Sequence, residues 1–137
     1  MNRVERYGPW AVITGASDGI GRAIAQRAAR DGLNVVLVAR SEAKLRALAA
    51  ELAQAHGVET TAVPVDLSQP AGPATLLDAL NGLPVGLAVL AAGFGTNGPL
   101  ADSPANDELE MISVNVTAVA QLAQAFAQRM TAQRHAG

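Results

Sequence analysis

Residues 14–21 read TGASDGIG, and the rest of the chain is arranged around this stretch. An apolar run at residues 10–13 precedes it, and a helical pattern begins at Ile20. Its glycines, Gly15, Gly19 and Gly21, let the backbone approach a ligand where a Cβ atom would block it. The dipole and the unpaired N–H groups of the following helix favour a pyrophosphate there. The stretch therefore predicts a phosphate-binding turn between a strand and a helix, although a glycine turn can also be a plain connector.

The composition indicates a single globular domain. The chain has 137 residues, of which 50% are hydrophobic and 16% are charged, and this is enough for one domain with a core. The net charge of -2 gives no reason to expect a nucleic acid or an anionic membrane surface as a partner. The chain has no cysteine, and His56 and His135 do not have metal-ligand spacing, so we expect no disulfide and no metal site. Neither a signal peptide nor a membrane span is recognisable, and we expect a cytoplasmic protein.

Apolar runs alternate with helical periodicity along the chain. Strands are predicted at residues 10–14, 34–39, 58–65 and 85–91, and helices at residues 19–31, 42–56, 73–80 and 104–132. Such alternation implies right-handed crossovers and a parallel sheet. The sequence therefore predicts an α/β fold, namely a partial doubly wound Rossmann fold with sheet order 3-2-1-4 and helices on both faces. We expect residues 1–137 to form a single incomplete dinucleotide-binding domain.

Two of the predicted helices have apolar faces that indicate how they pack. In the helix at residues 19–31, Ile20, Ile24 and Ala28 share one face. The helix at residues 104–132 has two neighbouring apolar stripes, and so wide an arc predicts burial on more than one side. The stripes are Leu109, Ile112, Val116, Val119, Ala123, Phe126 and Met130, and Met111, Val114, Ala118, Leu122 and Ala125.

Several polar or glycine positions follow the ends of predicted strands. The glycine turn, Arg40, Asp66 and Gly93 each come directly after a strand, so they should converge on one edge of the sheet. In such folds ligands bind at that edge, where the strand order reverses. Arg40 stands where a binder of NAD would place an acidic residue, and its guanidinium can form forked contacts with a 2′-phosphate. This predicts NADP (NADPH) as the cofactor; the alternative is an ordinary exposed arginine that opens a helix.

Four motifs in this order resemble the first half of a short-chain dehydrogenase/reductase. They are TGASDGIG, VLVARSEAKL, VDLS and the segment Ser113-Val114-Asn115. The longer stretch YGPWAVITGASDGIG further resembles hydroxysteroid dehydrogenases and long-chain 3-oxoacyl-CoA reductases. The resemblance implies cofactor contacts from Gly15, Ser17, Asp18, Gly19, Ile20, Gly21, Arg40, Asp66, Leu67, Ala92 and Gly93.

The resemblance also implies roles for single residues. Asp66 would accept a hydrogen bond from the adenine amino group while the backbone of Leu67 donates one; alternatively, Asp66 only forms a turn before Ser68. Ser17 would donate to a phosphate or serve only in the turn. Asp18 is an unusual neighbour for an anion, since some NADP-preferring members of the family have a basic residue there. Ala91 stands where the family usually has an asparagine that braces the turn.

Asn115 is the candidate catalytic residue. It lies on an apolar helix face, and a buried amide there needs hydrogen-bond partners. In the family this asparagine bends the helix and holds a water molecule of a proton relay. The alternative is a structural amide that bridges to a neighbouring strand.

The reaction of the family is hydride transfer between a nicotinamide and a carbonyl or alcohol carbon, with a tyrosine, a lysine four residues later and a serine assisting. This sequence has one tyrosine, Tyr7, and one lysine, Lys44, which cannot form that pair. We therefore expect an NADP(H)-binding N-terminal portion, truncated or separately encoded and inactive alone, that takes a small carbonyl substrate only when a C-terminal half completes it. The alternative is a non-catalytic nucleotide-binding or assembly module. A methyltransferase-like domain is disfavoured by the glycine spacing and by Arg40.

The predicted strand at residues 85–91 is expected to lie at an edge of the sheet. It carries neither lysine nor proline, which would discourage pairing with another chain. Together with the apolar surface of the last helix, this predicts self-association through that helix or through the strand edge.

Overall fold

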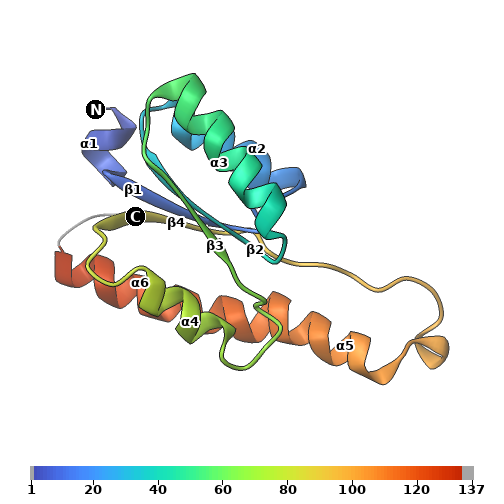
Figure 1. The fold of residues 1–137 in the computed structure, drawn as a ribbon. Helices are drawn as coiled ribbons and strands as arrows, with labels where there is room; N and C mark the ends of the chain where they lie inside the picture. Colours follow the sequence, from blue (N-terminus) through green and yellow to red (C-terminus); the bar gives the residue numbers. More distant parts are fainter. Residues whose placement is uncertain (1, 134–137) are drawn as a thin grey trace.

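The strands form one parallel sheet whose order is β3-β2-β1-β4 (Figure 1). This is a computed structural model that describes residues 2–133; Met1 and residues 134–137, which include His135, lie outside the described part. The strands are β1 (Trp10–Thr14), β2 (Asn34–Ala39), β3 (Thr60–Pro64) and β4 (Val85–Leu90). The predicted α/β class, strand order and parallel pairing are confirmed.

Helices cover both faces of the sheet, as predicted. In Figure 1, α2 and α3 lie on one face, and α4 and α6 lie on the other. The helices are α1 (Arg3–Tyr7), α2 (Gly19–Arg30), α3 (Glu42–His56), α4 (Gly72–Ala79), α5 (Ala105–Ile112) and α6 (Ala118–Gln133), and a short 3-10 turn, η1, spans Leu100–Asp102. In residues 2–133, no helix is both long and apolar enough to cross a membrane.

The two central strands divide the core into two clusters. Side chains of β1 and β2 alternate between the faces, so Ile13 and Leu37 pack against α2 and α3, while Val12 and Val36 pack against α4 and α6. Strands buried on both faces read as continuous apolar runs, which is why both were predicted with correct bounds. The third strand, β3, spans Thr60–Pro64 and is therefore shorter than the predicted strand at residues 58–65.

Helix α2 lies against the sheet through small residues rather than through the predicted face. Ala25, Ala28 and Ala29 are buried, Ile24 is half-buried, and Ile20 is 76% exposed. Of the three residues predicted to share one helix face, only Ala28 is therefore buried, and Ile20 is not part of the core. Because the first turn of α2 faces the carboxyl ends of the strands, the side chain of Ile20 lies beside a pocket instead of in the core.

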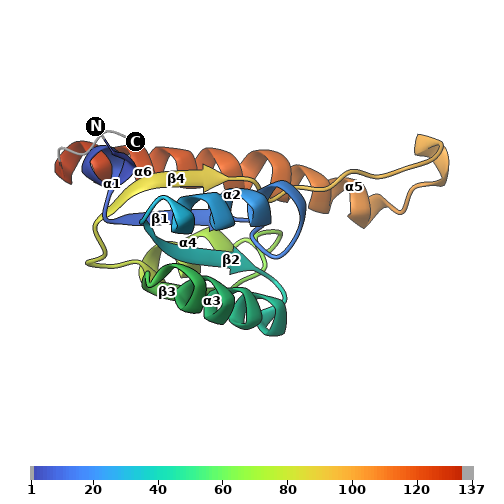
Figure 2. The same ribbon diagram turned by 90° about the horizontal axis from the view of Figure 1, so that it is seen from above.

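The expected helix over residues 104–132 forms as one continuous helix, but it contains a change of geometry. A π-helical turn, η2 (Ser113–Thr117), joins α5 to α6. Every side chain of α5 is exposed or half-buried, and burial is concentrated on one stripe of α6, which consists of Ala118, Leu122, Phe126 and Met130. The expectation of burial on more than one side was wrong, because α5 and the loop before it extend past the end of the sheet (Figure 2).

Residues Arg3–Tyr7 form helix α1, in a segment that was expected to be a polar lead-in without a helix. A capping box begins this helix: the Asn2 side chain accepts from the N–H of Glu5 (2.8 Å), and the Glu5 carboxylate accepts from the N–H of Asn2 (3.0 Å). The helix contacts β4, where the backbone of Tyr7 leaves no room for a Cβ atom at Gly86. Tyr7 consequently lies at the amino ends of the strands.

Candidate functional site

The turn after β1 and the start of α2 need glycine at particular positions. Gly15 has a φ of +66°, and a Cβ atom there would lie 2.8 Å from the carbonyl oxygen of Ala91. A Cβ atom at Gly21 would collide with the carbonyl oxygen of Gly15 and lie 2.6 Å from its carbonyl carbon. At Gly19, with a φ of +54°, a Cβ atom would meet only open space among the described residues. Two of the glycines thus allow close packing, and Gly19 lets the backbone turn at an open surface.

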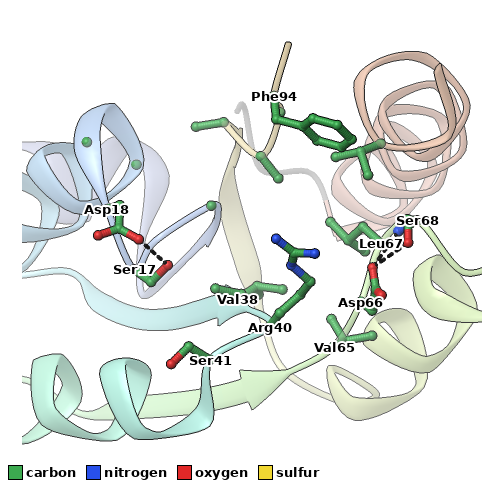
Figure 3. Close-up of a pocket in the computed structure, with 18 of the residues that line it drawn as sticks. Ser17, Asp18, Val38, Arg40, Ser41, Val65, Asp66, Leu67, Ser68 and Phe94 are labelled. Carbon is green, nitrogen blue, oxygen red and sulfur yellow. Dashed lines mark hydrogen bonds between the residues drawn. The ribbon is translucent and has the colours of Figure 1, made fainter. Parts of the chain in front are cut away.

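All residues predicted to contact the cofactor line one pocket of about 720 Å³ at the carboxyl ends of the strands (Figure 3). Its wall comes from the turn after β1, from the ends of β2, β3 and β4, and from Glu110 and Val114 on the α5–η2 helix. The volume lies in the range of small-molecule and cofactor sites. Asn115 is outside this lining, so the predicted catalytic residue and the predicted cofactor residues do not share one wall.

The N-terminus of α2 faces this pocket, and its N-cap residue is Asp18. An N-cap aspartate usually accepts from the backbone of its own helix. Here the carboxylate instead accepts from Lys44 Nζ at 3.2 and 3.4 Å and from the Ser17 hydroxyl at 3.1 Å. The hydrogen bond from Lys44 and the one from Ser17 lower the pKa of Asp18. The carboxylate is therefore ionised at neutral pH, and its charge is offset by Lys44.

Arg40 projects into the middle of the pocket. Figure 3 shows its guanidinium between the Ser17–Asp18 turn and the Asp66–Leu67 segment. The side chain follows β2 directly and is exposed, so its donors face the space where a ligand would lie. A planar fork of donors in such a place suits a phosphate.

Asp66 forms the turn that follows β3. Its Oδ1 atom accepts from the N–H of Ser68 (2.9 Å) and from the hydroxyl of Ser68 (2.7 Å). These bonds make an Asx-type turn, which fixes the carboxylate at the pocket wall. The hydroxyl of Ser68 is the main cause that lowers the pKa of Asp66, and the nearby charge of Arg40 lowers it further.

The end of β4 is braced by Thr14, whose role the sequence did not suggest. The buried hydroxyl of Thr14 accepts from the N–H of Ala92 at 3.1 Å. On the other side, the N–H of Ala16 donates to the carbonyl oxygen of Val38 at 3.1 Å. The glycine turn is thus tied to both neighbouring strands, with Ala91 at the position where the resemblance implies a bracing asparagine.

Asn115 lies in the π-helical turn, and its side chain is bonded at both ends to one residue. Its Oδ1 atom accepts from the N–H of Phe94 (3.0 Å), and its Nδ2 donates to the carbonyl oxygen of Phe94 (2.7 Å). Asn115 is exposed, so the expectation of a buried amide was wrong. The amide bridges the helix to the loop after β4, which resembles the structural alternative. A Cβ atom at Gly93 would lie 2.8 Å from its Oδ1 atom.

Sequence reasoning missed Ser41, Lys44, Ser68 and Phe94, which also line the pocket. Lys44 comes close to Asp18 because its side chain extends from the first turn of α3 toward the turn after β1. A separation of 26 residues along the chain gives no periodic signal. The position of Lys44 four residues after Arg40 was the one available hint, because a helix that opens at the strand end must bring its first turn near the pocket.

The comparisons with known proteins agree with this geometry. The family model described as "short chain dehydrogenase" matches residues 9–137. A 7beta-hydroxysteroid dehydrogenase of Collinsella aerofaciens is 41% identical over 116 residues, which are 85% of this chain and 44% of that protein. A very-long-chain 3-oxoacyl-CoA reductase of Scheffersomyces stipitis is 44% identical over 126 residues, 89% of this chain and 36% of that protein.

Solved structures match over nearly the whole chain. One from a study of 7beta-hydroxysteroid dehydrogenase stereoselectivity has a TM-score of 0.94 and 37% identity, and the match covers 99% of this chain and 54% of that one. A short-chain dehydrogenase from Sphingobium yanoikuyae in complex with NADPH has a TM-score of 0.89 and 37% identity, covering 94% of this chain and 51% of that one. The chain thus spans between 36% and 54% of the length of these relatives.

Proposed function

Because this chain belongs to the short-chain dehydrogenase family, we propose that it binds NADP(H) as the N-terminal portion of an oxidoreductase. The observation that carries the proposal is the placement of Arg40 at the centre of a pocket whose wall includes a glycine turn and a helix N-terminus. The solved relative that contains NADPH supports the same cofactor.

The residues present fit such a cofactor. The close packing at Gly15 and Gly21 leaves backbone N–H groups of α2 directed at the pocket, where a pyrophosphate would accept hydrogen bonds. Arg40 would hold the 2′-phosphate, and the turn at Asp66 and Leu67 would receive the adenine. When bound, a nicotinamide supplies the hydride donor or acceptor. The chain's own residues bind the dinucleotide and orient it.

We expect these residues alone not to reduce a carbonyl. Proton transfer in this family uses a tyrosine and a lysine side by side. Here Tyr7 is in α1 at the amino ends of the strands (Figure 1), and Lys44 lines the pocket at the opposite ends. Turnover of a panel of ketones by the purified chain, abolished by Tyr7→Phe, would contradict this expectation.

The cofactor proposal is tested by titrating the purified chain with NADPH and with NADH. Arg40→Asp should weaken NADPH binding by a factor of about 100, since it removes a charge-assisted fork and adds a repulsive charge, while NADH binding stays within a factor of about 3. Arg46→Asp is the matched control, because Arg46 pairs with Glu42 on α3 outside the pocket (2.7 Å). Equal losses for both dinucleotides would show that Arg40 does not bind the 2′-phosphate.

We further propose that the chain self-associates through the helix formed by α5, η2 and α6 or through the edge of β4. Leu109, Ile112 and Val116 are 62%, 48% and 58% exposed, and in the described part of the chain β4 pairs only with β1. An apolar edge and an apolar patch together favour a second copy as the partner. Sedimentation at micromolar concentration tests this, with Leu109→Glu expected to shift the protein toward monomer. A cooperatively unfolding wild-type monomer would refute it.

A further inference from the structure

We propose that Lys44 is a second cation for the 2′-phosphate of the dinucleotide and that Asp18 holds its ammonium at the pocket wall until the phosphate binds. The inference rests on the proposed function, because it concerns the same pocket. It assigns to Lys44 a part in choosing between NADPH and NADH.

The position of Lys44 supports this assignment. Ser41 caps α3, and its hydroxyl accepts from the N–H of Lys44 (3.4 Å), so the lysine lies in the first turn, close to the end of β2 that carries Arg40. Lys44, Ser41 and Arg40 all line the pocket. Two cations of different shape therefore lie on one wall, a planar fork from Arg40 and a point charge on a flexible stem from Lys44.

The contact between Lys44 and Asp18 is one that a ligand can share. The Lys44 Nζ atom lies 3.2 Å from one carboxylate oxygen of Asp18 and 3.4 Å from the other. The two side chains are 59% and 72% exposed, and exposed ion pairs of this kind contribute little to stability. An ammonium group has three donors, so Lys44 can keep one on Asp18 and turn another toward a phosphate oxygen.

The charges explain why an aspartate is tolerated beside an anion. An unpaired carboxylate on the wall would repel a phosphate that carries about two negative charges. Lys44 offsets the charge of Asp18, and Arg40 adds a positive charge to the wall, whereas Asp66 and Glu110 add negative ones. Asp18 thus positions the lysine, and Lys44 makes the contact with the ligand.

A merely structural role for the pair is the competing explanation. The pair connects α2 with α3, and it could serve only to hold these helices together. A second ion pair also connects α2 with α3, since Nη2 of Arg22 lies 3.5 Å from Oε2 of Glu51. Arg22 is outside the pocket lining, so it provides a control with the same loss of one positive charge.

The test measures dissociation constants of NADPH and NADH by titration calorimetry for the wild type, Lys44→Met, Asp18→Asn and Arg22→Met. Lys44→Met should weaken NADPH binding about 5- to 10-fold, the range expected for a partly exposed charge-assisted contact, and NADH binding less than about 2-fold. Asp18→Asn keeps an oxygen that can accept from Lys44 but removes a charge that repels the phosphate, so it should strengthen NADPH binding about 3-fold. Arg22→Met should change both constants by less than about 2-fold.

A second measurement reports on the lysine directly. Lys44 is the only lysine in the sequence, so reductive methylation with ¹³C-formaldehyde places one side-chain probe in the protein beside the labelled N-terminal amine. Its NMR signal should shift on addition of NADPH and stay nearly unchanged with NADH. Because methylation keeps the positive charge, the probe does not remove the interaction that it observes.

The outcomes separate the inference from the proposed function. If Lys44→Met changes NADPH and NADH affinity equally, or no more than Arg22→Met, the lysine does not contact the 2′-phosphate and the inference is wrong, even where Arg40→Asp remains selective. If the wild type binds neither dinucleotide, the proposed function fails and the inference fails with it.

Discussion

Replacing Gly21 with alanine tests the packing on which the pocket depends. The new Cβ atom would collide with the carbonyl oxygen of Gly15 and lie 2.6 Å from its carbonyl carbon and 3.0 Å from the carbonyl oxygen of Thr14. Ordinary contacts between carbon atoms are about 3.5–4.0 Å, so the N-terminal end of α2 must move by about 1 Å. The neighbouring atoms belong to the backbone and cannot rotate away.

The size of the effect follows from two opposing terms. Overpacking of this kind costs about 1–3 kcal/mol and belongs at the upper end here, whereas alanine gains about 1 kcal/mol over glycine within a helix. We therefore expect the free energy of unfolding to fall by about 2 kcal/mol. The same displacement moves the N–H groups of α2, so NADPH binding should weaken by a factor of about 10 or more.

The assay is urea unfolding, monitored through the fluorescence of Trp10. Trp10 is the only tryptophan in the sequence, and it begins the strand that precedes the turn. Gly57→Ala is the control: its φ of +66° predicts a strain of about 1 kcal/mol, but a Cβ atom there meets no described atom within 4 Å. This control should bind NADPH as the wild type does. A Gly21→Ala protein with unchanged affinity and a free energy of unfolding within about 0.5 kcal/mol of wild type would refute the reasoning.

Three further changes test other contacts. Asn115→Ala removes both hydrogen bonds to the backbone of Phe94, so the Phe94 amide should exchange about tenfold faster with solvent deuterium. Ser68→Ala should raise the pKa of Asp66 toward 3.8, as measured by ¹³C NMR titration. Because folding lowers this pKa in the wild type, the ionised Asp66 stabilises the folded state at neutral pH, and this stabilisation is lost as the pH falls below about 4. Phe126→Ala should cost about 3–5 kcal/mol in urea unfolding, because Phe126 is 2% exposed in the core; a loss below about 1 kcal/mol would contradict its burial.

The sequence was sufficient for the sheet and for the place of the pocket. Strands such as β2 are covered on both faces, so their apolar runs are unambiguous, and the topology then brings every strand end to one edge. The residues after those ends, including Arg40 and Asp66, line one pocket for that reason. Their roles toward a cofactor remain predictions.

Contacts between segments far apart in the chain could not be predicted from the sequence. The reach of Lys44 to Asp18 depends on how α3 lies beside the turn after β1. The exposure of Leu109 depends on where the sheet ends, since an apolar stripe on a helix indicates burial only if something covers it. The π-helical turn leaves no mark in the spacing of apolar residues. The Asn115 side chain in that turn is bonded to Phe94, which lies 21 residues earlier in the chain.

The continuous helix formed by α5, η2 and α6 belongs to two cooperative units of unfolding. The α6 end shares the core with Phe126 and Met130, so its amides should open only when the whole domain unfolds. Beyond the sheet, α5 is held mainly by hydrogen bonds to the loop that precedes it. The Glu108 carboxylate accepts from Ser103 (2.7 Å) and Thr96 (2.8 Å), and the Asn115 side chain is bonded to the backbone of Phe94. Protection from hydrogen exchange should therefore rise steeply along one uninterrupted helix, and the projecting half can melt and reform while the sheet stays folded.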